Sequence, residues 1–131
     1  SSDVCSSDLS APYLGFCEAD DPLYLETRNT LLSQENPYYF EGDYAHAIGS
    51  PHTPEGYVWP IAMAMQGLTS HDKAEKERIL DQLVAADAGT HLMHESFDAN
   101  DPNSYTRPWF SWANMMFCEL VMDYFGIHVK L

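Results

Sequence analysis

Two loop segments carry most of the side chains that could do chemistry. Residues 50–60 contain a histidine, a glutamate, a tyrosine and a tryptophan. Residues 87–114 contain Glu95 beside a histidine, and Arg107 close to two tryptophans. Pyranose rings stack their C–H faces on aromatic side chains, and their hydroxyl groups need polar partners. These segments therefore predict a sugar-binding site, with the alternative that the tryptophans are core anchors at helix starts.

Four helices are expected to position these loops. Their predicted ranges are about Pro22–Ser33, Trp59–Thr69, His71–Ala88 and Arg107–Phe125. Aspartate and proline mark the first start, Ser70 is the expected cap of the third helix, and glycines follow the last two. The second and fourth helices are apolar almost all round, which predicts inner, buried helices. The third is amphipathic and is expected to lie outside them.

This alternation of inner and outer helices predicts an all-α fold, part of an α/α toroid whose long inter-helix loops form the site. No alternation of period two appears that would predict a strand ladder. Two helices that are apolar all round cannot bury themselves in a chain of this length. We therefore expect the chain to be a piece of a larger domain which, expressed alone, folds poorly and is inactive.

The first ten residues differ in character from everything that follows. They are polar and unpatterned, without the features of a signal peptide, and residues 3–9 resemble a common sequencing adapter read in frame. We expect residues 1–10 to be a non-native prefix, with a flexible natural tail as the alternative. Without Cys5, Cys17 and Cys118 remain, and their spacing predicts neither a disulfide framework nor a metal knuckle. Cys118 lies in an apolar helical pattern, so it is expected to be buried.

The composition excludes several classes of protein. The chain has 131 residues, a net charge of −14 and 45% hydrophobic residues, so general disorder is excluded. A strongly acidic chain is a poor partner for nucleic acid or for an anionic membrane surface. Its apolar runs are too short for a membrane span. Few cysteines and no visible leader favour the cytoplasm, although localisation stays unknown.

A metal site is the main alternative chemistry. His91 and His94 precede Glu95 in an H-x-x-H-E string, which looks superficially like a zinc motif. The string is neither H-E-x-x-H nor H-x-x-E-H, and the expected loop lacks the helical frame that those motifs need. No metal site is therefore predicted.

Several long motifs together resemble one known family. The strings NPYYFEG, SPHTPEGYVWPIAMAMQGLTS, DAGTHLMHESF and TRPWFSWANMMF are similar to glycoside hydrolase family 125, in order and at matching spacing. The resemblance covers about Tyr13 to Leu131 and corresponds to the C-terminal third of such an enzyme. It implies that residues 11–131 are the C-terminal portion of an (α/α)6 catalytic domain. It also implies exo-acting, inverting α-1,6-mannosidase activity with no metal or other cofactor.

The resemblance also implies a role for one carboxylate. The glutamate of the family's MHESF motif, its general base, matches Glu95. In an inverting glycosidase the base deprotonates the attacking water while a second carboxyl group, roughly 6.5–9.5 Å away, protonates the leaving oxygen. The family's general acid is an aspartate upstream of this chain. Its position is therefore outside the sequence.

Further residues are predicted to bind substrate. They are His52, Tyr57, Trp59, His94, Arg107 and Trp109. Tyr57 and Trp59 could form a stacking platform, and Arg107 either clamps two hydroxyls or forms a salt bridge. His94 either orients the base or caps a turn. Asn114, on an otherwise apolar face, could serve only to satisfy a buried backbone group.

The implied substrate is a mannose-containing oligosaccharide or N-glycan, and the implied partner is the remainder of the chain's own catalytic domain. Neither nucleic acid nor a membrane is expected as a partner. Two alternatives stay open. One is another toroidal glycosidase with a different sugar preference, and the other is a non-catalytic sugar-binding module that uses the same aromatic loops.

Overall fold

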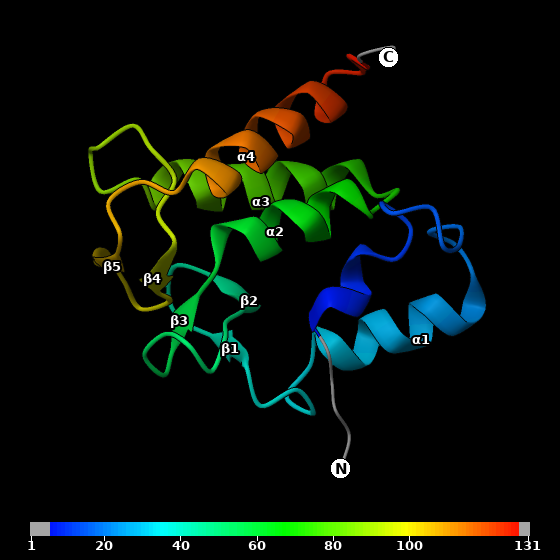
Figure 1. Ribbon diagram of the computed structural model, residues 1–131, viewed down its shortest axis with the longest axis horizontal. Helices are drawn as coiled ribbons and strands as arrows, with labels where there is room; N and C mark the ends of the chain where they lie inside the picture. The colour runs from blue at the N-terminus through cyan, green and yellow to red at the C-terminus, as the bar shows by residue number, and fades with distance from the viewer. Residues whose placement is uncertain (1–5, 129–131) are drawn as a thin grey trace.

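The computed structural model describes residues 6–128, with three helices packed side by side and small sheets gathered at one end of them (Figure 1). The helical elements are η1 (Ser6–Ser10), α1 (Pro22–Leu31), α2 (Pro60–Leu68), α3 (Lys73–Ala85) and α4 (Ser111–Tyr124). The strands are β1 (Tyr39–Glu41), β2 (His46–Ile48), β3 (Tyr57–Val58), β4 (Ser96–Asp98) and β5 (Asp101–Thr106). Helices α2, α3 and α4 form the packed group, whereas η1 and α1 lie together at its other end.

The prediction of an all-α fold, and with it of a partial (α/α)6 toroid, is wrong for this chain. Both expected loops pair into antiparallel sheets, one of β1 and β2 and one in the order β3-β4-β5. Most of the strands span only two or three residues, which is too short for an alternating pattern to be recognised in the sequence. The longest, β5, contains Pro102, which an edge strand tolerates but which indicates a loop when only the sequence is available.

The four predicted helices are present, with corrected ends. Asp21 caps α1 as expected, because its Oδ1 accepts hydrogen bonds from two backbone N–H groups. Asp72 rather than Ser70 caps α3, and the Ser70 hydroxyl instead accepts from the Asp72 N–H. Helix α4 begins at Ser111, later than predicted, because the residue before it is still extended.

The main core lies where the packed helices meet the three-stranded sheet. It joins Met63 and Ala64 of α2 and Leu120 of α4 to Val58 and Phe97 of the sheet. No residue of α2 is exposed, as predicted for an inner helix. Helix α4 is buried on one face only within the described chain. None of these helices has the length and apolar character needed to cross a bilayer.

The exposed face of α4 corrects two expectations. Cys118 is exposed rather than buried. Trp112 and Met115 are 66% and 69% exposed, so the helix is not covered all round by the described residues. An apolar surface of this kind on a helix is typical of an interaction face.

A second, smaller core packs the start of the chain against α1. Leu9 of η1 is fully buried against Leu31 and Ile48. Cys5 and the rest of residues 1–5 lie outside the described residues. The foreign origin proposed for residues 1–10 stays a prediction.

Gly49 follows β2 and packs tightly against both sheets. A Cβ at this position would lie 2.1 Å from the backbone oxygen of Tyr57 and 2.9 Å from the Phe40 ring. Because Tyr57 is paired with Asp98, its carbonyl cannot shift freely. We expect Gly49→Ala to lower the free energy of unfolding by at least about 2 kcal/mol, as overpacking does elsewhere.

Urea titration of the larger domain that contains this chain measures this loss. Gly89→Asn is the matched control, because Gly89 has open space around it and a φ of +75° that asparagine tolerates. Equal losses in the two variants would contradict the proposed clash.

Candidate functional site

The carboxylate of Glu95 is held at both of its oxygens. Glu95 immediately precedes β4, and its side chain is 18% exposed. Its Oε1 accepts a hydrogen bond from the Thr106 hydroxyl at 3.1 Å, and its Oε2 lies 3.1 Å from Arg107 Nε. The β4–β5 hairpin sets this geometry because it pairs Ser96 with Thr106, so that the residues before and after this pair face each other. The carboxylate is therefore fixed in orientation and still reaches solvent.

A chain of hydroxyl groups leads to Glu95. The oxygens of Ser96 and Thr106 lie 2.6 Å apart, and Ser96 is fully buried. The single hydroxyl hydrogen of Thr106 is donated to Glu95, so Ser96 must be the donor to Thr106. This order makes both hydroxyl groups part of the support of the carboxylate.

Arg107 adopts a backbone conformation that few non-glycine residues take. Its φ is +37°, at the point where β5 ends, and its side chain is 69% exposed. The salt bridge to Glu95, one of the two predicted roles, is present. An exposed ion pair contributes little to stability, so its effect is on orientation. Since Nε takes the carboxylate, the terminal nitrogens of the guanidinium stay available for hydroxyl groups.

His94, the residue before Glu95, is buried and does not face solvent. It is 1% exposed, its ring stacks on Tyr105 at 3.9 Å between centroids, and its Nδ1 lies 2.6 Å from the Pro108 carbonyl oxygen. Its Nε2 is buried without a hydrogen-bond partner among residues 6–128. The structure therefore places His94 in the interior, in contact with the segment that carries Arg107.

The aromatic residues of the predicted site lie on neighbouring elements. Tyr57 belongs to β3, next to β4, and its hydroxyl is hydrogen-bonded to Ser104. Trp59 precedes α2, and its ring meets the Phe110 ring edge-on at 6.4 Å. Trp109, the residue before that phenylalanine, is 60% exposed. An exposed indole ring on the segment that follows Arg107 is suited to stacking on a sugar.

His52 is the predicted site residue that the structure does not bring to the others. It is exposed in the turn before β3, and its backbone N–H donates to Ser50. Its imidazole makes no hydrogen bond to any other described residue. The same turn does contact the aromatic group, because Thr53 accepts a hydrogen bond from the Trp59 indole.

The H-x-x-H-E string does not form a ligand set. The His91 side chain is 90% exposed and faces Asp87, whereas His94 is directed to Pro108. Among the residues that the structure describes, no three His, Cys, Asp or Glu side chains are grouped as they would be around a metal ion.

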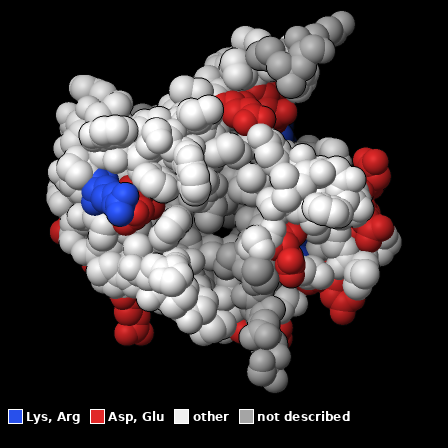
Figure 2. All heavy atoms as spheres, in the orientation of Figure 1, with Lys and Arg blue, Asp and Glu red and all other residues white. Residues whose placement is uncertain are grey.

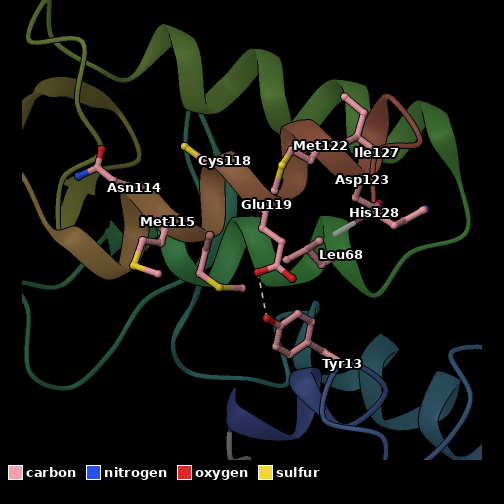
Figure 3. Close-up of a pocket in the computed structure, with 11 residues that line it drawn as sticks. Tyr13, Leu68, Asn114, Met115, Cys118, Glu119, Met122, Asp123, Ile127 and His128 are labelled. Carbon is pink, nitrogen blue, oxygen red and sulfur yellow. Dashed lines mark hydrogen bonds between the residues drawn. The ribbon is translucent and has the colours of Figure 1, made fainter. Parts of the chain in front are cut away.

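A cavity of about 720 Å³ lies elsewhere, along the exposed face of α4 (Figure 3). Met115, Met122 and Ile127 are among its lining residues, and the Tyr13 hydroxyl donates to Glu119 across it at 2.9 Å. Burial raises the pKa of Tyr13, and the hydrogen bond to Glu119 and the charge of Glu119 raise it further. None of the predicted site residues lines the cavity. Its apolar lining suits protein packing, whereas the fixed carboxylate and exposed indole of the hairpin suit sugar chemistry.

The surface charge agrees with the acidic sequence. Acidic groups outnumber basic ones on the face shown in Figure 2, and most of its central area is uncharged. An extended basic surface, which a phosphate backbone requires, is not seen on this face.

Sequence reasoning missed the residues that support Glu95. Ser96 and Thr106 are separated along the chain, and only the hairpin register brings their hydroxyl groups together. The signal in the sequence that could have pointed to Thr106 is its position directly before Arg107. The prediction that Asn114 satisfies a buried backbone group is confirmed, because its Oδ1 accepts a hydrogen bond from the Met93 N–H at 2.9 Å.

Comparison with known proteins finds a matching family model, a similar protein and a similar solved structure. A family model described as metal-independent α-mannosidase (GH125) matches residues 4–122. The Schizosaccharomyces pombe protein called meiotically up-regulated gene 157 protein is 52% identical over 116 residues, which are 88% of this chain and 23% of that protein. A solved structure from Streptococcus pneumoniae, described as a metal-independent α-mannosidase in a non-productive complex with α-1,6-mannobiose, is 61% identical with a TM-score of 0.91.

The match to the streptococcal structure covers 92% of this chain and 28% of that chain. The chain therefore spans about a quarter of the length of these two relatives.

Proposed function

Because the chain belongs to the metal-independent α-mannosidase family GH125, we propose that the protein containing it is an exo-acting α-mannosidase that removes terminal α-1,6-linked mannose. The reaction inverts the anomeric carbon, and Glu95 is the general base. The observation that carries the proposal is the fixed carboxylate, with Thr106 on one oxygen and Arg107 on the other.

The orientation and solvent access of the Glu95 carboxylate support its proposed role as a base. Oriented by two donors and still reached by solvent, Glu95 can accept a proton from a water molecule that attacks the anomeric carbon. Proton transfer to a positioned base contributes typically about 10²–10⁴-fold to a rate. The leaving oxygen needs a protonated carboxyl group on the opposite side of the sugar. We assign that acid to polypeptide that the relatives have and this chain does not.

The proposed substrate is a mannose-containing oligosaccharide such as an N-glycan. The α-1,6-mannobiose complex of the streptococcal relative supports this choice of sugar and linkage. Tyr57, Trp59 and Trp109 provide aromatic surface for the ring, and the terminal nitrogens of Arg107 provide donors for its hydroxyls. His52 can contribute to the site only if substrate or further polypeptide supplies a hydrogen-bond partner for its imidazole.

The remaining polypeptide of the enzyme is also the proposed cover for the exposed face of α4. Apolar side chains that face solvent there include Trp112, Met115, Phe125 and Ile127. Met115 and Ile127 line the cavity, which a helix from that polypeptide can fill. We therefore expect residues 11–131 alone to be poorly folded and inactive.

Activity is measured in a polypeptide of the relatives' length, referred to below as the full-length protein. The streptococcal relative with its matching segment replaced by this sequence is a practical choice, given their 61% identity. We expect it to release mannose from α-1,6-mannobiose, with the β-anomer detected first by NMR and with no loss of rate in a chelator. First appearance of the α-anomer would contradict inversion, and no hydrolysis would contradict the activity.

Trp109 offers a separate test of the sugar-binding surface. We expect Trp109→Ala to raise KM by about 5–10-fold, because stacking of a ring on an exposed aromatic face is worth about 1–1.5 kcal/mol. The melting temperature should change little, since the indole is 60% exposed. Val84→Ala, an exposed apolar change on α3, is the control and should leave KM unaltered. An unchanged KM in Trp109→Ala would exclude the stacking role.

A further inference from the structure

The two groups that fix Glu95 are themselves carried by one short segment, Tyr105–Pro108. Thr106 is only half-buried, and the Arg107 side chain is largely exposed. Arg107 also has a positive φ of +37°, a conformation that costs on the order of 1–2 kcal/mol for a residue with a Cβ. Such a conformation persists only where its surroundings enforce it. The segment therefore needs a contact that holds it in place.

His94 provides contacts at both ends of this segment. At one end its ring lies flat on Tyr105, with an interplanar angle of 4°. At the other end its Nδ1 is 2.6 Å from the carbonyl oxygen of Pro108. A carbonyl oxygen can only accept a hydrogen bond, so Nδ1 must carry the hydrogen. The side chain is almost fully buried and adjoins Glu95 in the sequence.

We propose that His94 is a positioning residue that clamps the Tyr105–Pro108 segment, so that Thr106 and Arg107 hold the two oxygens of Glu95. This inference rests on the proposed function, in which Glu95 is the base. It assigns His94 a structural task behind the carboxylate instead of a contact with the sugar.

The surrounding backbone allows this clamp to be removed without unfolding the site. The Phe110 N–H donates to the Met93 carbonyl, and Asn114 accepts from the Met93 N–H. These bonds attach the start of α4 to the residue before His94 and do not involve the imidazole. Loss of the ring is therefore expected to loosen residues 105–108 more than the rest of the hairpin.

Three variants separate the two contacts in the full-length protein. His94→Asn keeps an N–H donor close to the position of Nδ1 but loses the stacked ring. His94→Phe keeps the ring but loses the donor, and His94→Ala loses both. We expect His94→Ala to lower kcat by about 10²-fold, as misplacement of a catalytic group by about 1 Å does. The other two should recover part of that loss. KM should rise less than kcat falls, because His94 itself does not contact the sugar, whereas Arg107, which it holds in place, is proposed to do so.

A double-mutant cycle distinguishes clamping from general destabilisation. Thr106→Val removes the hydroxyl that holds Glu95 while keeping the shape of the side chain. If His94 acts through this segment, Thr106→Val should lower kcat strongly in the parent and little in His94→Ala. His71→Asn, an exposed histidine before α3, is the control and should leave kcat unaltered. Additive losses, or a lower melting temperature with an unchanged kcat, would overturn the clamp.

A crystal structure of the full-length His94→Ala variant tests the clamp without reference to activity. We expect the Thr106 and Arg107 contacts to be broken and the Glu95 carboxylate to take more than one position. A carboxylate that stays in its single position with both contacts intact would overturn the inference. If the contacts break but Glu95→Gln keeps full activity, the clamp stands and the proposed base fails.

Discussion

Glu95→Gln in the full-length protein should lower kcat for α-1,6-mannobiose by about 10³-fold or more, within the range that a general base contributes. The amide keeps the size of the side chain and can still accept from Thr106 at its carbonyl oxygen. It cannot take a proton from water. The dissociation constant for the disaccharide, measured by calorimetry, should therefore change by only a few fold.

The same measurement separates an enzyme from a sugar-binding module. A module would keep its affinity and show no turnover in either protein, whereas the proposed enzyme loses turnover alone. Glu55→Gln is the matched control, since Glu55 is an exposed carboxylate in the turn before β3. Sugar release that is as fast in Glu95→Gln as in the parent would remove Glu95 from the mechanism.

Arg28→Met should lower the free energy of unfolding by about 3–5 kcal/mol, the usual cost of breaking a buried ion pair by removing one partner. The Arg28 side chain is 8% exposed and joins α1 to the α2–α3 corner. Its two terminal nitrogens donate to Thr69 Oγ1 at 2.7 Å, to the Gln66 carbonyl at 2.9 Å and to Glu75 Oε1 at 3.0 Å. Methionine fills similar volume but donates to none of these acceptors, and it leaves the Glu75 carboxylate with hydrogen bonds from Ser70 and Gln66 but without its ion-pair partner.

Urea unfolding of the full-length protein measures this loss. Arg78→Met is the control, because Arg78 is exposed on α3 and should cost well under about 1 kcal/mol. Adding Glu75→Gln to Arg28→Met should recover part of the loss, since the second change removes the unpaired charge. A loss in Arg28→Met no larger than in Arg78→Met would show that the network is not stabilising.

The same network predicts a pH dependence of stability. Burial raises the pKa of Glu75, but hydrogen bonds from Ser70 and Gln66 and the charge of Arg28 outweigh it, so the pKa is lowered from 4.5. A lowered folded-state pKa means that this stabilisation is fully present above about pH 4.5 and is lost as the pH falls through the lower folded value. The urea concentration at the unfolding midpoint should therefore decrease when the pH is lowered below about 4.5. The decrease that is due to Glu75 should be smaller in Arg28→Met.

The sequence predicted the helices well because their signals are local and repeated. Asp21 before a proline and the apolar pattern of α2 both lie within one or two turns of helix, and both predictions are confirmed. The cap of α3 was misassigned because Ser70 and Asp72 are both good capping residues, and only the backbone decides between them. Cys118 was misassigned because apolar periodicity does not show whether the described chain covers every face of a helix.

The sheets and the supports of Glu95 could not be predicted for a different reason. They depend on register between segments that are separated in the sequence, and strands of two or three residues carry no readable alternation. The motif predicted Glu95 as the candidate base, but its contact with Thr106 exists only once Ser96 is paired across the hairpin. The buried position of His94 was equally invisible, because a histidine beside a candidate base reads as a ligand contact.

The compactness of the hairpin has an evolutionary consequence. Glu95, Thr106 and Arg107, together with the histidine behind them, all lie within residues 94–108. A recombination breakpoint outside this range transfers the carboxylate with its surroundings intact, whereas one inside it separates the carboxylate from its donors. Replacement of neighbouring loop walls would then change the surface around the site, while the proposed base and its two donors are inherited as a single block.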